Sequence, residues 1–396
     1  MLINTERVTH LMKRDGLDSL LATTAENVYY LSGVQSLVQA MFPRDSQVYV
    51  LVSCDTLKEP IAIIPTVDAD TALEGFENTK VMNYGDFYRY LGENISLTPF
   101  ETQLKQIVID TQPKKDAYTA LLEVIQECGL EKKVLGYDER GIDPSYINRL
   151  ENDLPYITLK PVSLIFKEIR MVKTAEEISR IGMAALITEN AIMKSLRIVR
   201  EGISEIDLAL EFEKSLLDAG ARLNFTCLHF GRNIAFLETH PNSTCLKNHD
   251  LIWFDVGCYY KGYASDTSRV FAFGDPGEHA INLYQALYKG WHTGIQSIRS
   301  GAHTQKVFQD CMTSVRENGI PGYNRSHVGH GIGLETYDPP NLSLNDAWQL
   351  EKGMVINLEL PYYEIGFGGF NIEDTLVVTD GNPKMLTSLD RDLVVL

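Results

Sequence analysis

The segment "LIWFDVGCYYKGYASDTSRVF", which starts at Leu251, places two carboxylates, Asp255 and Asp266, among residues that favour buried β-strands. Its central Tyr-Lys-Gly indicates a hairpin turn. Pairing Asp255 with Asp266 leaves a two-residue loop, Tyr260-Lys261, and sets the two carboxylates opposite each other, with Cβ atoms ~4.5–5.5 Å apart. Two like charges this close are costly unless one is protonated or a cation lies between them. The alternative is that one aspartate belongs to a turn and the register differs.

A second acid pair follows in "VINLELPYYEIGFGGFNIEDTLVV", where Glu359 and Glu373 flank a glycine-rich turn centred near Gly366. Counting inward from both glutamates brings them face to face as well. Strand glutamates often face solvent, which is the alternative here. The apolar neighbours Leu358 and Ile372 instead favour a position in the core.

Two histidines, His327 and His330, lie between the acid pairs in "SHVGHGIGLETYDPP". A lone histidine is more often a core or surface residue than a ligand, and the glycine spacing does not match a dinucleotide-binding loop. Two aspartates, two glutamates and one histidine together suit Mn²⁺, Fe²⁺, Co²⁺ or Zn²⁺. Four carboxylates exceed what one small cation normally uses, whereas two ions ~3.5–4 Å apart could share them. We therefore expect the hairpin acids Asp255, Asp266, Glu359 and Glu373 to be metal ligands in a two-ion site, together with one of the two histidines.

The elements that must position these residues fall into two regions. Residues 1–163 alternate between helical and strand patterns, which is typical of an α/β domain. A helix is expected to end near Gly16, and strands are expected at 17–23, 46–53, 61–65, 106–110 and 132–138. Residues 164–396 begin with two long helices. The first starts at Thr174 with a capping box to Glu177, and the second runs from Ser204 to near Gly220.

Composition narrows the class of protein further. A chain of 396 residues with 44% hydrophobic content can bury sizeable cores. Its net charge of −17 argues against nucleic acid as a partner. No basic amphipathic run or stretch of ~20 apolar residues indicates a membrane. The N-terminus shows no signal-peptide pattern. The six cysteines are scattered without a CxxC pair, which predicts reduced thiols and a cytoplasmic protein.

Three segments, "FDVGCYYKGYASDTSRVFAFG", "GHGIGLE" and "ELPYY…GGFNIEDTLVV", resemble the signature segments of the pita-bread metallohydrolases. This family includes methionine aminopeptidase, aminopeptidase P, prolidase and creatinase. The resemblance covers 164–396, and the first 160 residues resemble the N-terminal domain of the creatinase type. It implies an α+β protein, with a creatinase-like α/β domain at 1–163. The pita-bread domain at 164–396 would contain a curved antiparallel sheet and pseudo-two-fold halves.

The resemblance also implies roles for individual residues. The family has five metal ligands in the order Asp, Asp, His, Glu, Glu, and the positions that match are Asp255, Asp266, His330, Glu359 and Glu373. The match implies two divalent ions, Mn²⁺ foremost, with a bridging water or hydroxide. Glu359 matches the glutamate that carries a proton to the leaving nitrogen. His240, in "FLETHPNS", matches a histidine that binds substrate near the carbonyl, and Tyr363 lies where related peptidases have a tyrosine. The resemblance further implies a homodimer in which the N-terminal domain of one subunit helps to close the pocket of the other.

Several positions depart from the family pattern. Tyr337 replaces a histidine seven residues after His330; its hydroxyl can donate a hydrogen bond but carries no imidazolium charge. Ser326 stands where a histidine is common, with His327 next to it as a candidate substrate contact. Asn371 replaces an arginine that recognises substrate, which removes a bidentate partner for a carboxylate.

These observations predict a hydrolase of an amide or peptide C–N bond, similar to Xaa-Pro aminopeptidase or prolidase, acting on a small peptide. The departures keep a second hypothesis open, namely an enzyme for a non-peptide small-molecule amide, as in creatinase, ectoine hydrolase or dimethylsulfoniopropionate lyase. A non-catalytic binding module is a third hypothesis. Such modules generally lose the ligand residues, and this chain has all five.

Overall fold

The computed structural model describes residues 2–43, 45–54, 56–237 and 239–396. The chain forms two compact units, of which the first ends at Ile169 and the second comprises Arg170–Leu396. Helix α8 (Ser163–Met171) begins at the predicted domain boundary and continues past this division. The boundary at residue 163 therefore stays a prediction.

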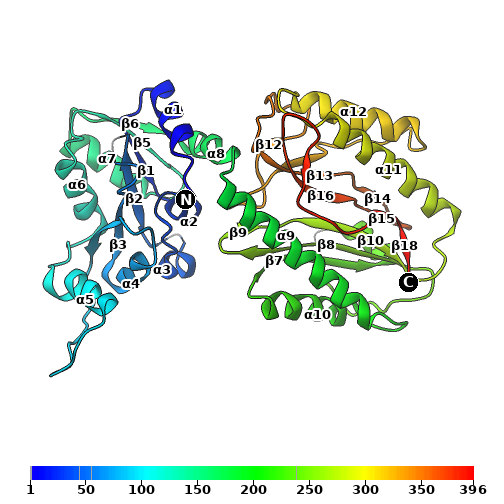
Figure 1. Ribbon diagram of the computed structural model, residues 1–396, viewed down its shortest axis with the longest axis horizontal. Helices are drawn as coiled ribbons and strands as arrows, with labels where there is room; N and C mark the ends of the chain where they lie inside the picture. The colour runs from blue at the N-terminus through cyan, green and yellow to red at the C-terminus, as the bar shows by residue number, and fades with distance from the viewer. Residues whose placement is uncertain (1, 44, 55, 238) are drawn as a thin grey trace. The chain divides into compact units, whose positions relative to one another are not determined.

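The first unit is built on a six-stranded mixed sheet with the order β4-β3-β2-β1-β5-β6 (Figure 1). Strand β1 pairs antiparallel with β2 and parallel with β5. The strands are β1 (Ser19–Ala22), β2 (Tyr49–Ser53), β3 (Ile61–Pro65), β4 (Lys80–Tyr84), β5 (Val134–Tyr137) and β6 (Thr158–Pro161). The helices are α1 (Thr5–Asp15), α2 (Ala25–Ser32), α3 (Leu37–Met41), α4 (Ala69–Leu73), α5 (Pro99–Lys105), α6 (Ala117–Glu127) and α7 (Pro144–Asp153). The expected α/β character of this region is confirmed.

One predicted strand of the first unit is wrong. The run "QIVID" forms a π-helical turn, Gln106–Asp110, that continues helix α5. Thr98 and Glu101 form a capping box at the start of α5, and Pro99 occupies the first helical position. These start signals, together with the exposure of the turn, outweigh the β-propensity of Ile-Val-Ile.

The second unit contains a mostly antiparallel sheet with the main order β12-β11-β13-β16-β10-β8-β7. Strands β9, β17 and β18 pair with β8, β16 and β10, and β14 and β15 form a separate hairpin. Its first strands are β7 (Arg222–Phe230), β8 (Leu251–Tyr260), β9 (Tyr263–Ala264), β10 (Thr267–Ala272), β11 (Gly329–Gly331) and β12 (Asp338–Asn341). The remainder are β13 (Val355–Glu359), β14 (Tyr362–Glu364), β15 (Gly368–Phe370), β16 (Glu373–Val377), β17 (Lys384–Met385) and β18 (Val394–Val395).

Each half of this curved sheet carries its own pair of helices (Figure 1). Helices α9 (Ala175–Ser195) and α10 (Glu205–Asp218) pack on β8 and β7, whereas α11 (Gly277–Ser297) packs on β13 and on α12 (Thr304–Glu317). A capping box starts α9, as the sequence predicts, and α10 begins after Ser204 with a second capping box, formed with Asp207. The curved antiparallel sheet with paired helices is the pita-bread arrangement expected for 164–396.

No helix in the described part of the chain is long and apolar enough to cross a membrane.

Candidate metal centre

The aspartate hairpin forms, but its predicted register is wrong by two residues. Asp255 lies opposite Ser268, and Asp266 therefore occupies a diagonal position. The loop is Lys261-Gly262, with φ angles of 48° and 81°, as in a type I′ turn. Glycine at the second loop position of this turn sets the register. A slip of two residues preserves the side-chain face, so both carboxylates still reach one side of the sheet.

The glutamate hairpin has the predicted register. Glu359 on β13 pairs directly with Glu373 on β16, and the turn contains Gly366 at a φ of 97°. Glu373 also pairs with Ser268 on β10. Strands β10 and β16 are thus neighbours, and this contact brings the two acid-bearing hairpins together.

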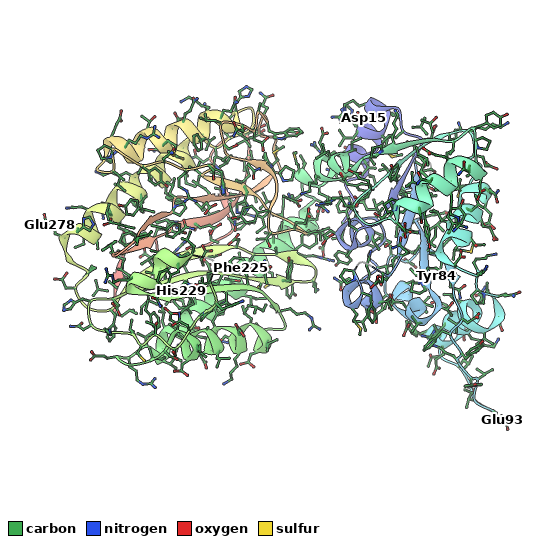
Figure 2. The ribbon with its side chains drawn as sticks, turned by 180° about the vertical axis from the view of Figure 1, so that it is seen from behind. Asp15, Tyr84, Glu93, Phe225, His229 and Glu278 are labelled. Carbon is green, nitrogen blue, oxygen red and sulfur yellow. The ribbon has the colours of Figure 1, made fainter. Side chains whose placement is uncertain are left out.

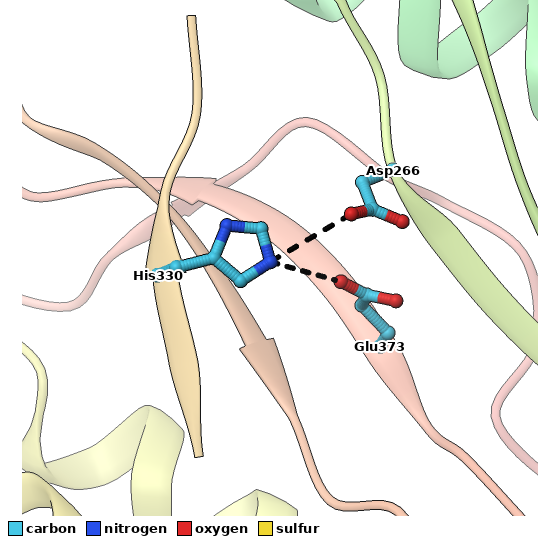
Figure 3. Close-up of side chains that lie close together, drawn as sticks. All are labelled: Asp266, His330 and Glu373. Carbon is cyan, nitrogen blue, oxygen red and sulfur yellow. Dashed lines mark ion pairs between the residues drawn. The ribbon is translucent and has the colours of Figure 1, made fainter. Parts of the chain in front are cut away.

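His330, on β11, turns one ring nitrogen toward two of these acids (Figure 3). Its Nδ1 lies 3.0 Å from the carbonyl oxygen of Gly331, which assigns the ring proton to Nδ1. The other nitrogen, Nε2, lies 3.7 Å from Asp266 Oδ2 and 3.8 Å from Glu373 Oε1. An unprotonated nitrogen therefore faces two carboxyl groups, and when these are ionised all three groups are acceptors. A cation between them would satisfy this arrangement.

The surroundings of these atoms fit a bound metal ion. Asp266 Oδ1 and His330 Nε2 are buried and have no hydrogen-bond partner within the described residues. Burial, followed by the charges of Glu373 and Asp255, raises the pKa of Asp266 well above its usual range. Burial also lowers the pKa of His330, which favours the neutral imidazole that metals bind. Asp266, His330 and Glu373 each offer an atom within 4.8 Å of the others. We conclude that the donor set suits a divalent ion.

All four predicted carboxylate ligands open onto one cavity of about 660 Å³ in the second unit. Strand β7 contributes a stretch of the wall that includes Phe225, which Figure 2 shows together with His229 on the same strand. The other predicted site residues that line this cavity are His240, His327, Tyr337 and Tyr363. His240 is exposed, whereas Tyr363 packs edge-on against Trp253.

Glu359 has polar neighbours on both of its oxygens. His327 Nδ1 lies 3.3 Å from Oε1, and Asn371 Nδ2 donates to Oε2 over 3.3 Å. Asn371 is fully buried and is not among the described residues that line the cavity. The contact that the structure shows for Asn371 is therefore its hydrogen bond to Glu359, a predicted metal ligand. A direct contact between Asn371 and substrate stays a prediction.

Tyr337 stacks on the imidazole of His330 and is 55% exposed. Burial of its hydroxyl region, followed by the negative charges of Glu359 and Glu373, raises its pKa, so the phenol stays protonated. The side chain is thus able to donate a hydrogen bond at the edge of the site.

Sequence reasoning missed two residues of this site. Asn357 donates to Glu373 Oε1 over 3.0 Å and to the carbonyl of Asp266 over 3.2 Å. An asparagine in the apolar strand "VINLE" was the available signal for this role. Arg325 lines the cavity, and its surroundings in "YNRSH" contain no pattern that marks it.

A curved sheet with paired helices and a buried carboxylate–histidine cluster defines the pita-bread class of metal-dependent hydrolases. The chain belongs to metallopeptidase family M24, whose model matches residues 179–380. A creatinase/prolidase N-terminal domain matches residues 5–172. Family membership implies divalent metal ions, in agreement with the donor set.

Individual relatives are similar over nearly the whole chain. The Xaa-Pro dipeptidase of Pyrococcus horikoshii is 25% identical over 391 residues, covering 98% of each chain. The crystal structure of the X-Pro aminopeptidase from Thermotoga maritima has a TM-score of 0.76 at 21% identity, covering 99% of each chain. The Xaa-Pro dipeptidase from Bacillus anthracis has a TM-score of 0.79 at 23% identity, again covering 99% of each chain. These two structures establish the fold.

Proposed function

We propose that this chain hydrolyses the amide bond of small Xaa-Pro peptides. The observation that carries the proposal is the geometry of His330, whose unprotonated nitrogen faces Asp266 and Glu373 at 3.7 and 3.8 Å, and these two acids line a substrate-sized cavity. Membership of a metallopeptidase family and similarity to a full-length Xaa-Pro dipeptidase support the choice of substrate.

We assign five residues as ligands of two divalent ions, with Mn²⁺ foremost and Fe²⁺, Co²⁺ and Zn²⁺ as alternatives: Asp255, Asp266, His330, Glu359 and Glu373. Oxygen-rich sites with a single imidazole accept several of these ions. When bound, such a pair of ions lowers the pKa of water and polarises a carbonyl group.

The side chains around the cavity would supply the remaining steps. Glu359, which accepts a hydrogen bond from Asn371 and lies 3.3 Å from His327, would take a proton from the attacking water and give it to the leaving nitrogen. Tyr337 would donate a hydrogen bond to the carbonyl oxygen as negative charge develops on it. His240 and Tyr363, on the cavity wall, would orient the substrate.

Turnover of Mn²⁺-loaded protein tests this proposal. The substrates are an Xaa-Pro dipeptide such as Ala-Pro, a longer Xaa-Pro peptide, and a matched dipeptide in which another residue replaces proline. Each is also assayed with a chelator as the control. We expect cleavage of the Xaa-Pro dipeptide that the chelator abolishes. Absence of metal-dependent cleavage of every Xaa-Pro peptide would contradict the proposal.

Small non-peptide amides are a second candidate class of substrate. The observation that favours them is the altered set of side chains at Tyr337, Ser326 and Asn371, where the resemblance expects two histidines and an arginine. A panel of small N-substituted metabolites in the same assay separates the two classes, because the preferred substrate has the higher kcat/KM.

A homodimer in the cytoplasm is a further proposal that rests on the family resemblance and on the cysteine content. Sedimentation analysis at working concentration tests the dimer, and a species of 44.5 kDa would contradict it.

A further inference from the structure

Arg325 brings to the cavity a positive charge that has no carboxylate partner in the described part of the chain. Among the described lining residues it is the one with a permanent positive charge, whereas five are acids: Glu213, Asp255, Asp266, Glu359 and Glu373. Its Nε is buried and has no hydrogen-bond partner within the described residues. In the same part of the chain, no carboxylate oxygen lies within 4.0 Å of its guanidinium. Arg325 lies over the Tyr363 ring, whose centroid is 5.9 Å from Arg325 Cζ.

Arg325 is half-buried with a sheltered Nε, and its situation differs from that of the fully buried arginines of the second unit. Arg269 forms an ion pair with Asp374 at 2.6 Å, and Arg170 forms one with Asp338 at 2.7 Å. Buried charges are normally paired, because removing them from water is costly unless a partner compensates. The sheltered Nε of Arg325 is thus prepared for an anion that the described part of the chain does not supply.

Arg325 and Glu359 line the same cavity, so an anion bound to Arg325 would lie in the space that also holds the proposed proton carrier. His327 is two residues further along the chain and lies 3.3 Å from Glu359, the proposed proton carrier. Two residues span at most ~7 Å of extended backbone, so the backbone of Arg325 lies within that distance of the backbone of His327, and both side chains line the cavity. A negatively charged group of the substrate one residue beyond the scissile bond would be placed to reach the guanidinium of Arg325. In a dipeptide, this group is the C-terminal carboxylate.

We propose that Arg325 binds the C-terminal carboxylate of a dipeptide-sized substrate and makes this chain select free acids. The inference rests on the proposed function. A guanidinium presents parallel N–H donors that match the two oxygens of a carboxylate. Asn371, where the resemblance expects an arginine, is buried against Glu359 and outside the described lining. The cation of this site therefore comes from a different segment, the chain that leads into β11.

Three substrates with wild-type and variant protein test the inference: Ala-Pro, its C-terminal amide and the tripeptide Ala-Pro-Ala. For Mn²⁺-loaded wild type we expect kcat/KM to be at least about tenfold higher for the free dipeptide than for the amide, because a hydrogen bond to a charged group is lost. Arg325→Gln should reduce this ratio toward one, mainly through KM. Arg325→Lys should retain part of the ratio, because lysine keeps the positive charge but lacks the parallel N–H donors of the guanidinium. Arg299→Gln, which removes an exposed arginine away from the cavity, should keep the wild-type ratio.

The outcomes separate this inference from the proposed function. Equal rates of wild type on acid and amide, or an equal loss of both rates in Arg325→Gln, would overturn the role of Arg325 and leave peptide hydrolysis standing. Without any turnover the proposed function fails, and calorimetric titration of Mn²⁺-loaded protein with L-proline and L-prolinamide decides the role of Arg325. Tighter binding of proline that Arg325→Gln abolishes supports the inference, whereas equal binding of the two compounds overturns it.

Discussion

Tyr337 lies flat against His330, with 3.7 Å between the ring centroids and 19° between the ring planes. The contact covers one face of an imidazole that presents its free nitrogen to Asp266 and Glu373. Tyr337 thus has two separable features, the ring that shields the proposed ligand and the hydroxyl that can reach the substrate.

The hydroxyl of Tyr337 is the first target for substitution. Tyr337→Phe keeps the stacked ring and removes the donor, so we expect kcat to fall by at least about tenfold with unchanged metal content. Steady-state kinetics and elemental analysis of the same preparation measure both quantities. Tyr337→Ala also removes the ring and should lower the metal content. Wild-type kcat in Tyr337→Phe would exclude the hydroxyl from the reaction.

Removal of metal should destabilise the protein in a pH-dependent way. The pKa values of Asp266 and Glu373 are raised mainly by burial, so the folded metal-free protein binds protons that the unfolded chain has released. Stability of this form must therefore fall as pH rises above the usual carboxyl pKa of about 4. Thermal melts with chelator at pH 5 and pH 8 should show a lower Tm at pH 8. Added Mn²⁺ should reverse the loss, and equal melting temperatures would contradict this prediction.

Asp266→Asn should separate metal binding from stability. The change removes one of several acids that share a buried space, so the metal-free variant should melt at a higher temperature than metal-free wild type. It should also lose metal binding and turnover, as should His330→Ala. A variant with normal metal content and activity would show that Asp266 is not a ligand.

The ion pair between Arg170 and Asp338 should stabilise the segment that carries Tyr337. Both side chains are almost completely buried, and Arg170 also contacts Glu335. Burial opposes ionisation of Asp338, but Arg170 and then Lys173 hold its pKa below the usual value. We expect Asp338→Asn to cost about 3 kcal/mol at pH 7, because a buried charge loses its partner.

The stability that Asp338 contributes is present above the carboxyl pKa of the unfolded chain and is lost as pH falls through the lower folded pKa. The difference between wild type and Asp338→Asn in urea unfolding should therefore shrink below pH 4. Asp380→Asn, which breaks an exposed ion pair with Lys352, is the matched control and should change stability little. A pH-independent difference for Asp338→Asn would contradict the ionic explanation.

Gly257 should tolerate no side chain. A Cβ at this position would lie 2.2 Å from the carbonyl oxygen of Ser265, across the hairpin that carries Asp255 and Asp266. We expect Gly257→Ala to cost about 3 kcal/mol and to lower metal content, because backbone has to move. Gly381→Ala, with no atom within 4 Å of the added carbon, should unfold like wild type. A normal metal content in Gly257→Ala would mean that the hairpin adjusts without moving the aspartates.

The two acid hairpins show what sequence could predict. The register of the glutamate pair followed from a turn centred on Gly366, and the structure has this register. The aspartate pair was set two residues off, because equal counting from both acids ignored the preference of a type I′ turn for glycine at Gly262. The ligand face survived the error because side chains alternate with a period of two along a strand.

Other parts of the site were beyond local patterns. Arg325 stands out because it lines the acidic cavity while its buried Nε has no hydrogen-bond partner among the described residues, and both facts depend on tertiary packing. The stacking of Tyr337 on His330 likewise depends on how the chain after β11 folds back. In the first unit, the sequence "QIVID" was assigned as a strand because β-branched residues favour strands, and the helix that starts at Thr98 overrode this local preference.

The single register contact between β10 and β16, Ser268 opposite Glu373, is where the two hairpins of the centre meet. Asp266 lies just before one of these strands, and Glu373 begins the other. An ion bound by both Asp266 and Glu373 would link β10 and β16 where these strands share few backbone contacts. Metal binding should therefore stabilise the whole sheet. The dissociation rate of the ion would then set how long the two acid-bearing hairpins stay joined.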